Sequence, residues 1–257
     1  MRSICAPRCA LFLRAVGIST GLVIVAAIGI FPVFAGVTLD ADSASAPSAA
    51  SRASRQWAKV DIAAGGAIRG SVELMEGPRQ SVNPSETSDA VVYFLPKAGA
   101  VAPKPQRFTV DTRSKGFNPT LLVAPVGSTV AFENSDTILH NVFSRSGANG
   151  FDLGFYGPGQ TREHTFARTG LVVVNCSVHQ NMRANVLLLG TPYFTRPDKK
   201  GRFRIDGVPS GTGTLVIWHP RGAPISLELD GPANVPKQRI IATKSPLDPN
   251  AHEGHGR

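Results

Sequence analysis

The stretch LVVVNCSVHQNM, residues 171–182, ends an apolar run with three side chains that bind metal ions. Cys176 closes the run, His179 follows three positions later, and Met182 three positions after that. A run of β-branched residues that ends in turn-forming residues is typical of a buried strand. We therefore expect a strand that delivers Cys176 to one end of a sheet, followed by a loop that carries His179 and Met182.

A second histidine, His140, stands upstream at the start of another short apolar run, HNVFS at 140–144. One thiolate, two imidazoles and one thioether are the ligand set of a blue-copper site, in which the thioether is the weak axial ligand. The soft thiolate binds both oxidation states of copper, and the thioether favours Cu(I). His140, Cys176, His179 and Met182 are therefore candidate copper ligands.

Three other interpretations compete with copper. A lone cysteine is often a buried structural residue, but both histidines would then be unexplained. A Cys–His nucleophile would place its base on the same tight loop, and no oxyanion donor is indicated. Zinc could use two histidines and a cysteine, which would leave Met182 without a role. Copper gives all four residues a function.

The rest of the sequence favours many short strands. The chain of 257 residues has 42% hydrophobic residues, 26 Gly and 20 Pro, so it turns often. No window keeps a helical apolar stripe over three turns, whereas many runs alternate apolar and polar residues. We predict an all-β protein of one or two sandwiches. The clearest strand candidates are 67–74, 90–95, 128–133, 140–144, 171–176, 184–189, 202–205, 213–218, 225–229 and 238–242.

The N-terminus predicts export. Residues 1–14 contain three arginines and no acid, and 15–35 are uncharged and largely apolar. We interpret residues 1–35 as a signal peptide or an uncleaved membrane anchor, which places the remainder in the periplasm or another extracytoplasmic space. Residues 36–57, rich in Ser and Ala, predict a flexible tether. Residues 246–257 predict a disordered tail.

Cysteine use and charge narrow the function further. Cys5 and Cys9 fall in the leader, so its removal leaves Cys176 without an intramolecular disulfide partner. The formal net charge of +9 becomes +6 without residues 1–35, and these charges are scattered. No aromatic platform is interleaved with them. We therefore expect no nucleic-acid partner, and membrane attachment only through an uncleaved N-terminal anchor.

Cys-x-x-His-x-x-Met, with an upstream His-Asn after a Phe-x-Asn-x-Asp stretch, resembles the cupredoxin family of blue copper proteins. The short ligand loop is most similar to those of amicyanin-like and pseudoazurin-like members. The resemblance implies a Greek-key β-sandwich over residues 107–190 with one type 1 copper site. It also implies that the side chain of Asn141 ties the two ligand loops together.

The resemblance further implies a function without substrate turnover. We expect a one-electron carrier that serves redox proteins such as a dehydrogenase or a c-type cytochrome. Two alternatives stay open at this point. One is a module that binds or delivers copper without electron transfer, and the other is a structural β-sandwich with a vestigial site.

The flanking segments, 58–106 and 194–245, together resemble the small β-sandwich of carboxypeptidase regulatory-like domains. Gly-x-Phe-x-Ile-x-Gly-Val-Pro-x-Gly at residues 201–211 carries the likeness. We expect a second small β-domain whose two halves flank the copper segment, as in plastocyanin-like proteins labelled methylamine-utilisation proteins. The remaining candidates are interpreted as follows: Trp218 is core, His219 is a surface turn residue, His164 is exposed, and His252 and His255 in the tail bind copper weakly at most.

Overall fold

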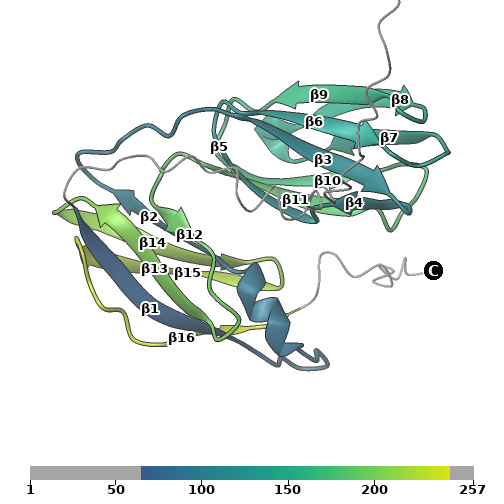
Figure 1. Ribbon diagram of the computed structural model, residues 1–257. Coiled ribbons are helices and arrows are strands. Elements are labelled where there is room, and N and C mark those ends of the chain that lie inside the picture. The colour runs from purple at the N-terminus through teal and green to yellow at the C-terminus, as the bar shows by residue number, and fades with distance from the viewer. Residues whose placement is uncertain (1–64, 244–257) are drawn as a thin grey trace, which may run out of the picture. The chain divides into compact units, whose positions relative to one another are not determined.

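The computed structural model describes residues 65–243, and the regular elements of this part are β-strands and two short 3-10 helices. The strands make four sheets (Figure 1). The predicted all-β class is confirmed. None of the helices in this part is long and apolar enough to cross a membrane. The predicted leader or anchor, the tether and the tail lie outside the described residues.

Residues 107–190 form two of the sheets, which Figure 1 shows as two layers. The five-stranded sheet has the order β5 (Leu121–Pro125), β11 (Arg183–Leu189), β10 (Gly170–Asn175), β7 (His140–Ser144), β8 (Phe151–Tyr156). The four-stranded sheet has the order β4 (Gly116–Asn118), β3 (Arg107–Arg113), β6 (Thr129–Asn134), β9 (Thr161–Thr165). The short 3-10 helix η2 (Gly147–Asn149) joins β7 to β8.

One hydrophobic core belongs to these two sheets. Because side chains alternate between the faces of a strand, every second residue contributes to it. Phe108 and Val110 of β3 and Val172 and Val174 of β10 are examples, each at most 2% exposed. The inward-facing side chains of the two sheets thus share one buried cluster.

Strands β5 and β11 are buried on both faces. Leu122 and Leu188 belong to the core of the two sheets. Their neighbours Leu121 and Leu187 belong to another buried cluster, which includes Val91. A strand that is covered on both faces reads as a continuous apolar run, and LLVAP and VLLL in these two strands do so.

The segments on either side of residues 107–190 share their sheets. β1 pairs with β13 and β16, and β2 pairs with β14 and β12. The predicted domain boundaries, and the likeness to carboxypeptidase regulatory-like domains, stay predictions. The bounds of these elements are β1 (Gly66–Met75), η1 (Pro84–Asp89, a 3-10 helix), β2 (Val91–Pro96), β12 (Phe194–Thr195), β13 (Arg202–Val208), β14 (Thr212–His219), β15 (Gly222–Asp230) and β16 (Gln238–Ile241).

Candidate metal centre

The strand order brings the predicted ligands to one end of the five-stranded sheet. His140 is the first residue of β7, and Cys176 follows Asn175, the last residue of β10. The two strands are antiparallel neighbours, so the start of one lies beside the end of the other. The loop from β10 to β11 carries His179 and Met182.

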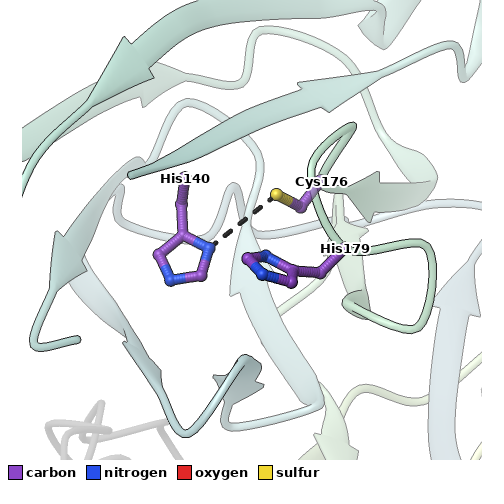
Figure 2. Close-up of side chains that lie close together, drawn as sticks. All are labelled: His140, Cys176 and His179. Atoms are coloured by element: carbon purple, nitrogen blue, oxygen red, sulfur yellow. Dashed lines mark hydrogen bonds between the residues drawn. The ribbon is translucent and has the colours of Figure 1, made fainter. Parts of the chain in front are cut away.

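The metal-binding atoms of His140, Cys176 and His179 lie within 4.8 Å of one another (Figure 2). The Cys176 Sγ is 3.9 Å from the His140 Nδ1, and the centroids of the two imidazole rings are 4.9 Å apart. In zinc sites, metal–nitrogen bonds are about 2.0–2.1 Å long and metal–sulfur bonds about 2.3 Å. Atoms this close together can therefore bind a single ion.

Met182 is anchored by the same loop. Its backbone N–H donates to the His179 carbonyl at 2.9 Å, and its carbonyl accepts from the Cys176 N–H at 3.2 Å. Its side chain is 1% exposed and belongs to the same buried cluster as Cys176. The fourth predicted ligand thus lies in the core, in a loop closed by its own backbone hydrogen bonds.

The four side chains differ in exposure. His140 is fully buried, and Cys176 and Met182 are at most 4% exposed. His179 is only partly buried, so it connects the site with solvent.

The residues fit a copper ion. The His179 Nδ1 is buried and has no hydrogen-bond partner within residues 65–243. Leaving a buried polar atom unpaired costs about 1–3 kcal/mol, and a metal bond would satisfy it. Two imidazoles, a thiol and a thioether are the donors that copper prefers, whereas zinc would leave the thioether unused.

Electrostatics favour the neutral form of His179. Burial, together with His140 and Lys115, lowers the pKa of His179, and Asp136 opposes the shift. Metals bind the unprotonated imidazole nitrogen, so a lowered pKa keeps His179 ready to bind.

Asn141 connects the two segments that carry the ligands. Its Oδ1 accepts from the Ser177 N–H at 2.7 Å and from the Ser177 hydroxyl at 2.8 Å. Its Nδ2 donates to Asp152 at 3.4 Å. The side chain therefore holds the residue after Cys176 against the residue after His140.

Asp136 is a part of the site to which the sequence assigns no role. Its Oδ2 lies 2.9 Å from the His140 Nε2. Burial works to raise the pKa of the Asp136 carboxyl, but the backbone N–H groups of Lys115 and Ser114, with His140, hold this pKa below its usual value. The Phe-x-Asn-x-Asp stretch was the signal that could have found it.

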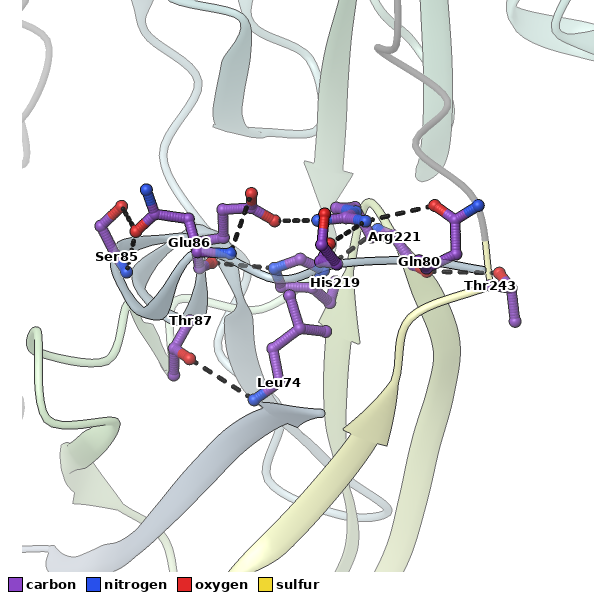
Figure 3. A network of polar contacts seen from close by, with 10 residues as sticks. Leu74, Gln80, Ser85, Glu86, Thr87, His219, Arg221 and Thr243 are labelled. Atoms are coloured by element: carbon purple, nitrogen blue, oxygen red, sulfur yellow. Dashed lines mark hydrogen bonds and ion pairs between the residues drawn. The ribbon is translucent and has the colours of Figure 1, made fainter. Parts of the chain in front are cut away.

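Two other histidines differ from expectation. His219 is 1% exposed rather than a surface turn residue, because β14 extends to it and its Nε2 donates to the Glu86 carbonyl at 2.9 Å (Figure 3). His164 is only partly exposed, since its ring stacks on Phe151 with centroids 4.3 Å apart. Neither joins the metal cluster. Trp218 packs partly buried against a core cluster, and His252 and His255 lie outside the described residues.

Two facing sheets hold a His–Cys–His cluster at one end, with a methionine buried in the loop that carries the cysteine. This is a cupredoxin fold. Comparison with protein families and with curated proteins found no match.

Three solved structures are similar to parts of this chain. A copper-containing nitrite reductase (NirK) from Thermus scotoductus SA-01 is 26% identical, with 45% of this chain covered and a TM-score of 0.32. This chain spans 28% of that protein's length. A purple cupredoxin from Nitrosopumilus maritimus is 24% identical, covering 34% of this chain and 100% of its own, with a TM-score of 0.29. An amicyanin variant in its Cu(I) form is 21% identical, covering 35% of this chain and 98% of its own, with a TM-score of 0.31.

The cupredoxin fold follows from the strand order of the two sheets and from the ligand cluster at their end.

Proposed function

We propose that this protein carries single electrons through one type 1 copper site formed by His140, Cys176, His179 and Met182. The observation that carries the proposal is the cluster of three ligand atoms within 4.8 Å, two of them on the segment that also carries the buried Met182. When bound, copper supplies a Cu(II)/Cu(I) couple whose balance depends on the axial ligand and on the surroundings of the thiolate. We propose no substrate turnover of its own.

The role of the protein is to hold the copper ligands in place and to exclude water from the site. The two hydrogen bonds from Ser177 to Asn141 fix one ligand segment against the other. The backbone bonds of Met182 fix the loop internally. Ligands held by such surroundings change position little when the charge at the site changes.

An apolar rim adjoins the partly exposed His179. It consists of Leu139, Phe155 and Val178, which are 57%, 60% and 46% exposed. Leu139 directly precedes His140, Val178 precedes His179, and Phe155 pairs with Asn141 across β7 and β8. Large apolar side chains that gather on a surface are typical of a docking site. The rim supports the proposal that a partner protein docks beside His179.

We propose a dehydrogenase or a c-type cytochrome as that partner, and an extracytoplasmic location. The export signal that the sequence predicts in residues 1–35 supports the location. Burial of His140, Cys176 and Met182 favours a copper ion that is retained over one that is handed on. For this reason we prefer electron transfer to copper delivery.

The rim provides the test. Leu139→Lys places a charge beside the site, and we expect the second-order rate constant for electron exchange with a c-type cytochrome to fall about tenfold, which corresponds to ~1.4 kcal/mol. Leu171→Lys is the control, because Leu171 is 38% exposed but lies at the opposite end of β10 from Cys176. Equal rate constants for the two variants, with copper bound in both, would contradict electron transfer through the rim.

A further inference from the structure

Two backbone N–H groups and an imidazole nitrogen converge on the carboxylate of Asp136. The Ser114 N–H donates to Oδ1 at 2.6 Å, and the Lys115 N–H donates to Oδ2 at 2.9 Å. The His140 Nε2 lies 2.9 Å from Oδ2. The Asp136 N–H in turn donates to the Asn134 Oδ1 at 3.0 Å. The carboxylate is thus fixed from several sides, with His140 as one of its partners.

The turn that binds this carboxylate has an unusual backbone. Ser114 and Lys115 join β3 to β4 with φ angles of 54° and 58°, in the left-handed region. This conformation costs a non-glycine residue about 1–2 kcal/mol. Successive N–H groups in turn conformations of this kind can form a concave anion-binding nest. The turn therefore offers two backbone donors to Asp136 at the cost of local strain.

An ionised carboxylate accepts hydrogen bonds and donates none. A hydrogen bond between the His140 Nε2 and Asp136 Oδ2 therefore requires the proton to be on Nε2. In a neutral imidazole the other nitrogen then carries the lone pair. That nitrogen is Nδ1, which lies 3.9 Å from the Cys176 Sγ (Figure 2).

We propose that Asp136, held by the nest at Ser114 and Lys115, is a positioning residue that fixes His140 in the Nε2–H form and so presents its Nδ1 to the metal. The functional role of Asp136 rests on the proposed copper function. The tautomer of His140 does not depend on copper and can be tested without it. Outer carboxylates of this kind also raise the basicity of a ligand histidine. The β3–β4 turn, which contains no metal ligand, thereby acts on the metal site.

The first test uses the metal-free protein, with the tautomer of His140 read from nitrogen-15 NMR at alkaline pH. We expect the Nε2–H form in the wild-type protein. In Asp136→Asn one acceptor oxygen must serve three donors, so the Nδ1–H form should gain population. Glu163→Gln is the control, because it also removes one negative charge from the sandwich but pairs with Arg107 on the surface. An unchanged tautomer in Asp136→Asn would overturn the proposal.

The second test leaves Asp136 in place and changes the nest. Lys115→Val and Lys115→Gly remove the same positive charge, but valine disfavours the left-handed conformation whereas glycine adopts it readily. We expect Lys115→Val to weaken Cu(I) binding about 10–100-fold, measured by competition with a chelator, and Lys115→Gly to retain wild-type affinity. Equal Cu(I) affinities in the two variants would contradict the proposal that the turn at Ser114 and Lys115 acts on the metal site.

The two proposals fail in different ways. A wild-type protein that binds no copper would contradict the proposed function, whereas the metal-free tautomer would still decide the role of Asp136. If Asp136→Asn folds poorly, the Lys115 pair still decides it, because Lys115→Gly preserves the backbone of the turn.

Discussion

Asn141 and Ser177 are joined by two hydrogen bonds across 36 positions of sequence, through the Ser177 N–H at 2.7 Å and the Ser177 hydroxyl at 2.8 Å. Asn141 follows one ligand histidine, and Ser177 follows the cysteine. The two ligand segments are therefore tied to each other by protein groups alone. This tie holds the segments that carry His140 and Cys176 against each other.

Replacing Asn141 should loosen the metal-free protein as well as the site. Asn141→Ala leaves the part-buried Ser177 N–H without its acceptor, so we expect the free energy of unfolding to fall by about 1–3 kcal/mol. Ser177→Ala loses only the hydroxyl bond and should cost about 0.5–1.5 kcal/mol. Urea unfolding of the metal-free proteins measures both. If Asn141→Ala had the same free energy of unfolding as the wild type, the hydrogen bonds between Asn141 and Ser177 would not stabilise the protein.

Replacing Met182 should change the reduction potential of the copper site more than the stability of the fold. Met182→Leu nearly conserves side-chain volume, so unfolding should become easier by less than about 1.5 kcal/mol. Met182→Gln replaces a soft sulfur donor with a harder oxygen, which favours Cu(II), so the reduction potential should fall. Redox titration of the copper-loaded proteins measures this change. A potential that is the same in Met182→Gln and the wild type would exclude Met182 as the axial ligand.

His219 should make stability depend on pH. Burial lowers the pKa of His219 from 6.5, and its Nδ1 accepts from the Arg221 N–H at 3.0 Å, a bond that only an unprotonated Nδ1 can accept. The unfolded chain therefore takes up the proton first as the pH falls. This contribution to stability is complete above the unfolded pKa of about 6.5 and is lost below it.

His219→Gln removes the titrating group, so we expect its unfolding free energy to fall less steeply between pH 7 and pH 5 than that of the wild type. Urea unfolding at several pH values measures the two slopes. His164→Gln serves as a comparison, because burial lowers the pKa of that histidine too, at a different place in the fold. Parallel slopes for the wild type and His219→Gln would refute the assignment of a neutral, buried His219.

Gly201 tests the packing of the flanking sheets. Its φ angle is 76°, and an added Cβ would lie 2.0 Å from the Val72 carbonyl oxygen. Gly201→Ala therefore combines backbone strain with a clash against the main chain, and should destabilise by more than ~2 kcal/mol. Gly99→Ala, with a φ of 66° and open space around it, should cost only the strain, about 1–2 kcal/mol. Thermal unfolding that shifts equally in both would rule out the clash.

Much of the fold could be predicted because its signals are local. Alternation marks β13 from residue 202, since every second side chain enters a core. The candidate ligands could be named for the same reason: Cys176, His179 and Met182 fall within one loop, and the combination of their side chains is chemically specific.

The parts that could not be predicted depend on distant segments. Asp136 becomes important because the turn at Ser114 and Lys115, 22 and 21 positions away, adopts a left-handed backbone beside it. No residue type in that turn demands such a conformation. His219 was wrongly expected at the surface because it precedes a proline, whereas it is buried and its Nε2 donates to the carbonyl of Glu86, 133 positions away.

The proposed function depends on copper binding by Cys176 together with two histidines. Adding one equivalent of Cu(II) to the purified metal-free protein tests it directly, with absorption and EPR spectra recorded for the wild type and for Cys176→Ser. We predict an intense blue absorption from the thiolate–copper bond and a small hyperfine splitting, both of which are lost in Cys176→Ser. A colourless wild-type protein, or a blue colour that survives in Cys176→Ser, would contradict the proposed function.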